Sequence, residues 1–205
     1  MFTVFLVDDD AGVLKALSRL LRAHGYVTRS FTSSREFLDG HDTAVPGCAV
    51  LDVSMPGLDG LELQQAMTTA GIQRPIIFIT GKGDIPTSVR AMKAGAIDFL
   101  PKPVRDEDLL SAIDNARGAD AKKREVQAER ASIQAKIATL TPREREVLVH
   151  VIAGRLNKQI AGALGTVEKT IKVHRGRMME KLGVRSVADL VRLAEKAGIS
   201  PRFNS

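Results

Sequence analysis

The sequence predicts an α/β domain followed by an all-α domain, and two observations carry this prediction. Along residues 1–118, short apolar runs alternate with helical patterns, whereas beyond residue 118 every pattern is helical. The charge divides at the same place: residues 1–118 carry 12 basic and 15 acidic side chains, and residues 119–205 carry 18 and 9. We therefore expect a first domain over 1–118, a helical linker over 119–138 and a second domain over 139–205.

The composition limits the possible classes of protein. One cysteine in 205 residues excludes an intramolecular disulfide framework and a cysteine-rich zinc site. No apolar run approaches the roughly 20 residues of a membrane span, and no basic segment precedes the first apolar run, so no membrane partner is expected and a cytoplasmic location is the default. The basic second part favours nucleic acid as a partner, although charge alone fits solubility equally well.

The elements of the first domain follow from the apolar pattern. Because the expected strands are apolar throughout, they fit a five-stranded, doubly wound parallel sheet that is buried on both faces. The expected strands are Thr3–Val7, Tyr26–Phe31, Cys48–Val53, Pro75–Thr80 and Ile97–Leu100. The expected helices are Gly12–His24, Ser33–Leu38, Leu61–Ala70, Ile85–Ala94 and one that starts near Arg105.

Polar side chains follow four of the five strands, at the edge of a parallel sheet where ligands bind. They are Asp8, Asp9, Asp52, Thr80 and Lys102. Each alone has an ordinary explanation as a helix cap, a turn residue, a strand residue or a solvated charge. Together they indicate a site, because clustered carboxylates need a cation and oxygen ligands favour Mg²⁺. A carboxylate beside such an ion can take up a phosphoryl group, which a lysine and a hydroxyl stabilise.

Four motifs resemble those of a response-regulator receiver domain. They are Val7-Asp8-Asp9-Asp10, the run Leu51–Gly60, Ile79-Thr80-Gly81 and the run Ala94–Pro103. The resemblance implies a strand order of 2-1-3-4-5, Asp52 as the phosphoacceptor and a cis Lys102–Pro103 bond. It further implies Mg²⁺ on Asp9, Asp52 and the Ser54 carbonyl, with Asp8 acting through water. Lys102 would bind the phosphoryl group, while Thr80 and Phe99 would act as the switch.

The stretch from Asp106 to about Leu140 predicts a helix that extends the last helix of the first domain, with Gly118 as the one break. A sparse apolar stripe runs along it through Val126, Ile133, Ile137 and Leu140. Pairing of this helix in a dimer stays open, but an exposed, charged linker helix is the favoured interpretation.

Four short helices are expected after residue 140, joined by glycine turns as in a helix-turn-helix domain. Thr141, Pro142 and Glu144 predict the first with a capping box. Asn157 and Thr166 are the expected caps of the second and third, and Ser186 begins the fourth.

The third of these helices has two faces. Its expected core face carries Val167, Ile171, Met178 and Leu182. Its opposite face carries Lys169, Lys172, Val173, Gly176 and Arg177, flanked by Arg175 and Lys181. The basic face suits the major groove, where Lys and Arg reach guanine or phosphate and Val173 reaches a thymine methyl, with Lys158 on phosphate. A solvated helix face is the ordinary alternative.

This second half resembles a LuxR-type DNA-binding domain, and the whole chain resembles FixJ/NarL-type regulators. The motifs are Leu140–Leu148, Asn157–Ala161, Thr170–Arg175 and Lys181–Ser186. The run Gly83-Asp84-Ile85-Pro86, with Ala91–Ala96, is closest to the FixJ branch. Gly176 departs from many relatives, which carry a long polar residue there.

The combined resemblance implies a two-component transcriptional regulator, with a sensor histidine kinase, promoter DNA and RNA polymerase as partners. Phosphorylation of Asp52 would promote a homodimer through Ile85–Gly95 and Ile97–Leu100, with activation the expected outcome. An aspartyl-phosphate phosphatase is one alternative, but Ser54 stands where such enzymes carry a second carboxylate. A receiver that works without phosphorylation is the other, and the complete set of site residues argues against it.

Overall fold

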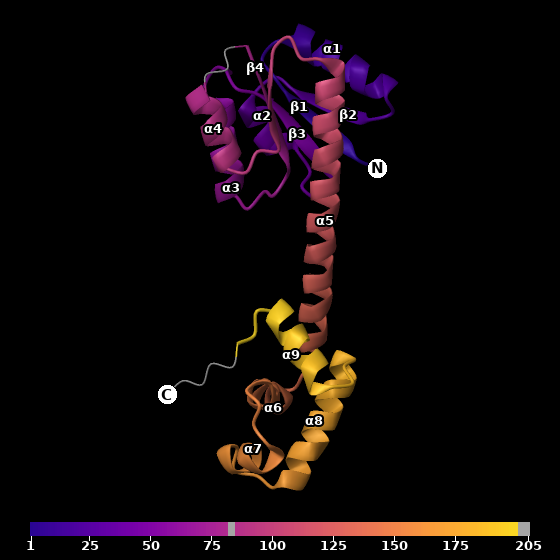
Figure 1. The fold of residues 1–205 in the computed structure, drawn as a ribbon, viewed down its shortest axis with the longest axis vertical. Coiled ribbons are helices and arrows are strands. Elements are labelled where there is room, and N and C mark those ends of the chain that lie inside the picture. The colour runs from indigo at the N-terminus through magenta and orange to yellow at the C-terminus, as the bar shows by residue number, and fades with distance from the viewer. Residues whose placement is uncertain (82–84, 201–205) are drawn as a thin grey trace. The chain divides into compact units, whose positions relative to one another are not determined.

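The computed structural model describes residues 1–81 and 85–200 and begins with a five-stranded sheet (Figure 1). All neighbouring strands are parallel, in the order β2-β1-β3-β4-β5. The strands are β1 Thr3–Val7, β2 Val27–Phe31, β3 Gly47–Asp52, β4 Ile76–Thr80 and β5 Asp98–Pro101. Each predicted strand therefore lies within one residue of an observed one. Gly83 and Asp84 of the FixJ-like run lie outside the described residues.

Helices cover both faces of the sheet, which explains why β1, β3 and β4 are buried at every position. The expectation that all strands are apolar is wrong for β2, which lies at an edge of the sheet and exposes Arg29 and Ser30. They are α1 Ala11–Ala23, α2 Ser34–Gly40, α3 Gly60–Thr69, α4 Ile85–Lys93 and α5 Asp106–Ala138. Successive strand residues point to opposite faces, so Val4 and Leu6 pack with α1 and α5, whereas Phe5 and Val7 pack with α2, α3 and α4. The expected doubly wound sheet is confirmed.

The remaining helices form the core of a second compact unit. They are α6 Pro142–Ile152, α7 Asn157–Ala163, α8 Glu168–Leu182 and α9 Val187–Lys196. The chain divides into an N-terminal unit, Met1–Arg124, and a C-terminal unit, Glu125–Ser205. The domain bounds at 118 and 138 stay predictions. Among the described residues, no helix combines the length and the apolar content that a membrane span needs.

Helix α5 runs through Gly118 without a break, so the interruption considered there is absent. Its last turns are not an exposed linker, because Ile133 and Ile137 are buried and belong to the same apolar cluster as Leu140 and α6. These residues recur at helical spacing on one face, and that face is covered. Val126 is 56% exposed, so the expected exposed helix applies to residues 125–132.

The expected caps of α7 and α8 are wrong by one residue. The N-caps are Leu156 and Val167, and neither makes a side-chain capping bond. Asn157 is instead the first residue of α7, where its Oδ1 accepts a hydrogen bond from Arg175 Nη1 at 3.1 Å. Asn157, which was expected to cap α7, therefore joins α7 to α8 through its hydrogen bond with Arg175.

The capping box of α6 is confirmed and serves a second contact. Thr141 Oγ1 accepts from the Glu144 backbone N–H at 3.2 Å, and Glu144 Oε2 accepts from the Thr141 N–H at 2.9 Å. The same Oε2 pairs with Lys181 Nζ of α8 at 2.7 Å, and the Glu144 side chain is 3% exposed. The Lys181 hydrogen bond, followed by the Thr141 backbone bond, lowers the pKa of Glu144.

We expect Glu144→Gln to flatten the acid dependence of the stability of the C-terminal unit. A carboxyl whose folded pKa is lowered stabilises the fold above its unfolded pKa, and that stabilisation is lost as the pH falls from about 5 through the folded pKa. At pH 7 the variant should lose about 1–3 kcal/mol, because Lys181 loses its charged partner. Urea unfolding between pH 4 and pH 7 measures both effects. The control is Glu146→Gln, in an exposed pair with Arg143; equal pH slopes in the two variants would contradict the assignment.

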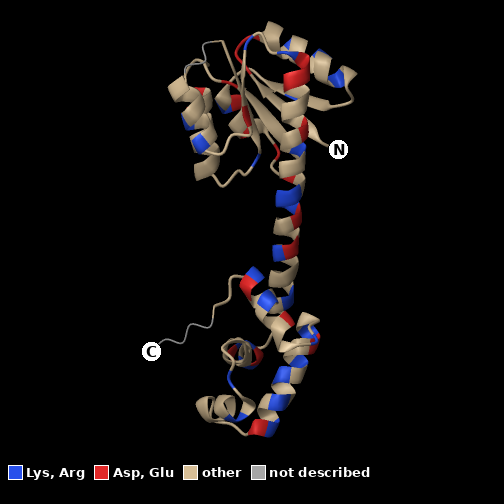
Figure 2. Cartoon of the chain, viewed as in Figure 1, with Lys and Arg blue, Asp and Glu red and all other residues tan. Residues whose placement is uncertain are grey.

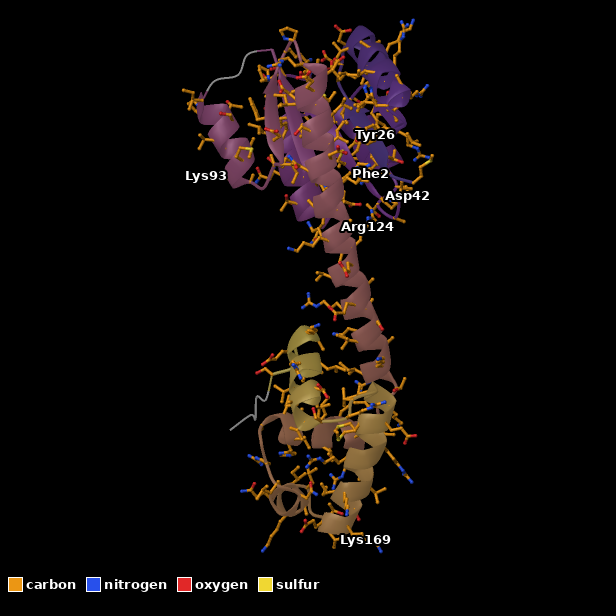
Figure 3. All side chains as sticks on the ribbon, turned by 45° about the vertical axis from the view of Figure 1, so that its right-hand side comes forward. Phe2, Tyr26, Asp42, Lys93, Arg124 and Lys169 are labelled. Carbon is orange, nitrogen blue, oxygen red and sulfur yellow. The ribbon has the colours of Figure 1, made fainter. Side chains whose placement is uncertain are left out.

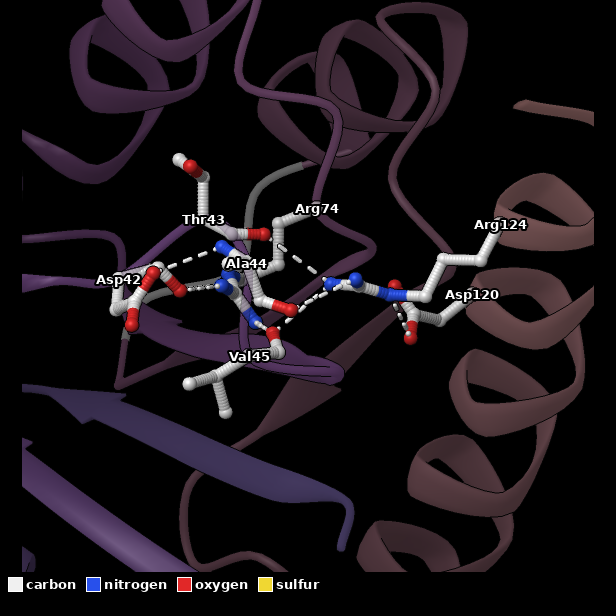
Figure 4. A network of polar contacts seen from close by, with 7 residues as sticks. All are labelled: Asp42, Thr43, Ala44, Val45, Arg74, Asp120 and Arg124. Atoms are coloured by element: carbon white, nitrogen blue, oxygen red, sulfur yellow. Dashed lines mark hydrogen bonds and ion pairs between the residues drawn. The ribbon is translucent and has the colours of Figure 1, made fainter. Parts of the chain in front are cut away.

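Two arginines join the segment before β3 to the rest of the N-terminal unit (Figure 4). Arg124 of α5 donates to the carbonyls of Thr43, Ala44 and Val45 at 2.9–3.2 Å and pairs with the buried Asp120 at 2.9 Å. Arg74 donates to the carbonyls of Asp42 and Val45 and lies over the Phe5 ring, 4.0 Å from its centroid. These contacts fix the turn of α5 at Asp120–Arg124 to the segment that leads into β3.

We expect Arg124→Ala to destabilise the N-terminal unit by about 2–3 kcal/mol, because it leaves a buried carboxylate and three carbonyls without this donor. Amide hydrogen exchange should accelerate at residues 118–124 and 42–47. The matched control is Arg117→Ala on the same helix, which breaks only the exposed pair with Asp114. Exchange that is unchanged in Arg124→Ala would show that the arginine does not hold this turn.

Candidate functional site

Two buried carboxylates and one ammonium meet at the carboxyl edge of the sheet. Lys102 follows β5, Asp8 follows β1 and Asp52 ends β3. Lys102 Nζ lies 2.7 Å from Asp8 Oδ2 and 2.7 Å from Asp52 Oδ1. The Asp8 and Asp52 side chains are 2% and 5% exposed. The convergence expected from the order of the strands is present for these three residues.

Backbone N–H groups hold the second oxygen of each carboxylate. The N–H of Asp10 donates to Asp8 Oδ1 at 2.9 Å, and the N–H of Ser54 donates to Asp52 Oδ2 at 2.7 Å. Each aspartate is thus oriented by the N–H group of the residue two positions after it in the chain. The sequence pattern did not predict these two hydrogen bonds. The helix cap in this run is the neighbouring Asp10, whose Oδ1 accepts from the N–H groups of Gly12 and Val13 at the start of α1.

The charges of the pocket act on Lys102. Burial by itself lowers the pKa of its ammonium, but the hydrogen bonds and charges of Asp52 and Asp8 outweigh burial, so the pKa is raised. The Lys102 side chain is therefore a positively charged ammonium group that contacts the Asp52 carboxylate. A group that carries negative charge on several oxygens would be stabilised there.

The other predicted pocket residues occupy different positions. Thr80 is buried at the end of β4, and its carbonyl accepts from the Lys102 N–H at 2.7 Å. Phe99 is partly buried, with its ring centroid 6.1 Å from that of Phe78. Asp9 is exposed beside Asp8. The Lys102–Pro103 bond is cis, as the resemblance implies.

No preformed cluster of three metal-ligating side chains exists among residues 1–81 and 85–200. Asp8 and Asp52 converge, but Asp9 does not join them. The donor chemistry nevertheless fits Mg²⁺, because the predicted set offers only oxygen atoms. Asp8, Asp52 and Lys102 carry a net charge of −1 where they meet, and the exposed Asp9 brings the predicted set to −2, the charge that a divalent cation balances.

The C-terminal unit presents a basic surface on α8 (Figure 2). Lys169 lies in the first turn of this helix (Figure 3), and Lys172, Val173 and Arg177 are exposed farther along it. The opposite face is buried through Ile171, Met178 and Leu182. The predicted division is therefore correct except at Val167, which is 65% exposed because it precedes the helix as its N-cap.

Three other basic residues of this unit differ in exposure. Lys158 is exposed in the first turn of α7. Arg175 is half-buried and holds Asn157, as described above. Lys181 flanks the basic face in sequence, but its ammonium pairs with Glu144 and donates to the Thr139 carbonyl at 3.3 Å. Its position on the helix did not reveal this structural role.

The fold and the two sites define a receiver domain joined to a helix-turn-helix DNA-binding domain. Residues 4–114 match the response regulator receiver domain, and residues 138–194 match the bacterial regulatory proteins of the luxR family. The chain belongs to the FixJ/NarL type of two-component response regulators, which regulate transcription. This family is one of transcription regulators and is not a class of enzymes.

Individual relatives cover nearly the whole chain. Nodulation protein W of Bradyrhizobium diazoefficiens is 47% identical over 96% of this chain and 87% of its own length. Transcriptional regulatory protein FixJ of the same organism is 41% identical over 96% of both chains. Among solved structures, the response regulator StyR matches with a TM-score of 0.83 and 47% identity, over 95% of this chain and 98% of its own.

Proposed function

We propose that a sensor histidine kinase phosphorylates Asp52 and that the phosphorylated protein binds promoter DNA as a dimer. The observation that carries this proposal is the position of Lys102, which lies 2.7 Å from both Asp8 and Asp52 at the carboxyl edge of the sheet. This arrangement places a fixed positive charge beside a carboxylate that can accept a phosphoryl group.

In the proposed transfer, a carboxylate oxygen of Asp52 bonds to phosphorus while the bond from phosphorus to the kinase histidine breaks. The leaving imidazole takes up a proton. Lys102 stabilises the charge on the transferred oxygens, and Thr80 binds one of them through its hydroxyl. Asp8, Asp9, Asp52 and the Ser54 carbonyl would hold Mg²⁺, which when bound supplies charge neutralisation and orients the phosphoryl group.

We propose that phosphorylation acts by a population shift through Thr80 and Phe99 toward a state that dimerises. Three apolar side chains support the choice of α4 as part of the dimer surface, because Ile85, Val89 and Met92 are 80%, 43% and 45% exposed. Exposed apolar side chains of this size on one helix are typical of a surface that binds another protein.

The DNA contacts are assigned to the basic surface of α8. Lys169, Lys172 and Arg177 would contact bases or phosphates, Val173 a thymine methyl, and Lys158 a phosphate. Arg175 would hold α7 against α8 through its Nη1 hydrogen bond to Asn157. Only its other N–H donors would then contact DNA. RNA polymerase is the proposed further partner and activation the proposed outcome, with the cytoplasm as the location.

The test is DNA affinity with and without acetyl phosphate. DNA that binds the phosphorylated protein is first selected from random sequences, and its affinity is then measured by gel shift in the presence of Mg²⁺. We expect tighter binding and a dimer-sized complex after phosphorylation. Equal affinity in the two states would contradict the proposed switch, and binding without sequence preference would contradict the role assigned to α8.

A further inference from the structure

A buried serine outside the charged pocket contacts the segment that follows Asp52. Ser34 is the first residue of α2, is 2% exposed, and donates its hydroxyl to the Leu58 carbonyl at 2.8 Å. Leu58 lies in residues 53–59, which connect β3 to α3 and contain Ser54. We name these residues the β3–α3 segment. The hydrogen bond thus joins it to a helix 24 residues earlier in the chain.

Backbone contacts hold both ends of the β3–α3 segment close to Asp52. At its start, the Ser54 N–H donates to Asp52 Oδ2 at 2.7 Å. At its end, the N–H of Gly60 donates to the Val53 carbonyl at 3.1 Å. A Cβ on residue 60 would stand 2.3 Å from the Asp52 carbonyl oxygen, so only glycine permits this approach. A displacement at Leu58 would therefore be transmitted to the peptide that holds the Asp52 carboxylate.

The hydroxyl of Ser34 is not needed to begin its own helix. The neighbouring Ser33 is the N-cap of α2, and its Oγ accepts from the Glu36 N–H at 3.2 Å. Two adjacent serines therefore have separate contacts, one within the helix and one to the β3–α3 segment. A buried hydroxyl is costly without a partner, so its bond to Leu58 restricts both groups to one arrangement.

We propose that Ser34 is a positioning residue of the phosphorylation site. Its hydrogen bond to the Leu58 carbonyl holds the β3–α3 segment so that the Ser54 peptide is set both to orient Asp52 and to offer its carbonyl to Mg²⁺. This inference rests on the proposed function. Ser34 would help to preorganise the site although its side chain does not touch the reacting groups.

The experiment compares Ser34→Ala with Ser33→Ala in the full chain. Mg²⁺ binding to the unphosphorylated protein is measured by calorimetry, and hydrogen exchange is followed at amides 53–60. We expect Ser34→Ala to weaken Mg²⁺ binding about 2- to 10-fold, the range that one hydrogen bond controls, and to accelerate exchange in the segment. Phosphorylation by acetyl phosphate should slow at low Mg²⁺ and recover at saturating Mg²⁺.

Ser33→Ala is the matched control, because it removes the hydroxyl of the adjacent serine, which caps α2 and makes no bond to Leu58. It should keep the Mg²⁺ affinity and the exchange rates of the wild type at residues 53–60. If Ser34→Ala does not fold, Ser34→Cys replaces it, since the somewhat larger thiol fills the site but donates only weakly.

Two outcomes would overturn the proposal. One is wild-type Mg²⁺ affinity in the variant at position 34, and the other is an equal loss of affinity in both serine variants. A wild-type protein that neither binds Mg²⁺ nor takes up phosphoryl would instead refute the proposed function, so the two failures are distinguishable.

Discussion

Asp52→Asn will take up no phosphoryl group, either from acetyl phosphate or from a cognate kinase. An amide oxygen is a far weaker nucleophile than a carboxylate, so the substituted side chain could not form the acyl phosphate. The fold should survive, because Lys102 keeps its 2.7 Å pair with Asp8 and asparagine has nearly the shape of aspartate. The variant should also lose the increase in DNA affinity after treatment with acetyl phosphate.

Radiolabel transfer and intact-protein mass measure this loss, and thermal unfolding checks the fold. The control is Asp39→Asn, which removes an exposed carboxylate on α2 and should take up label like the wild type. Label retained on the Asp52 variant would place the phosphoacceptor elsewhere. A variant that is unlabelled but still responds to acetyl phosphate would separate the switch from Asp52.

A double substitution, Lys172→Ala with Arg177→Ala, will abolish most of the sequence-specific DNA affinity. Both side chains are exposed on the basic face of α8, opposite the buried Ile171 and Met178. Each lost base contact should weaken binding by about 1–3 kcal/mol, and each lost phosphate contact should reduce the salt slope by about 0.9. Neither residue contributes to the core, so thermal stability should be unchanged.

Gel shifts at several salt concentrations, on specific and random DNA, separate the two kinds of contact. Loss on both DNAs with a smaller salt slope indicates phosphate contacts, and loss on the specific DNA alone indicates base contacts. Arg192→Ala on α9 controls for the loss of a positive charge, since it breaks only an exposed pair with Asp189. If the double variant bound DNA as tightly as Arg192→Ala does, the basic face of α8 would not be part of the DNA interface.

Features that depend on neighbours in the chain were predictable. The buried strands β1, β3 and β4 follow from apolar runs, and the capping box of α6 follows from Thr141 and Glu144 three residues apart. The meeting of Asp8, Asp52 and Lys102 was also predictable, although 94 residues separate Asp8 from Lys102. Parallel strands bring their carboxyl ends to one edge, so the topology alone places these residues together.

Pairings between side chains on different elements were not predictable. Asn157 was expected to cap a helix and instead binds Arg175, and Lys181 was placed beside the DNA face but pairs with Glu144. The helix end that carries Ile133 and Ile137 was expected to be an exposed linker because its apolar stripe is sparse, yet these side chains are buried in the C-terminal core. In each case a short-range pattern allowed several partners, and the choice among them depended on which surface packs nearby.

The amino-acid order alone was enough to establish the class of protein, the elements of both domains and the edge of the sheet at which the charges gather. The class of protein rests on the resemblance of its motifs to known families. The elements and the edge of the sheet rest on periodicity and on the geometry of parallel strands, which act within a few residues or through topology. Packing in three dimensions decided that Asp9 stays exposed beside the buried Asp8, and that Ser34 reaches Leu58. Such contacts depend on ångström-scale distances between elements, which no local pattern of residue types encodes.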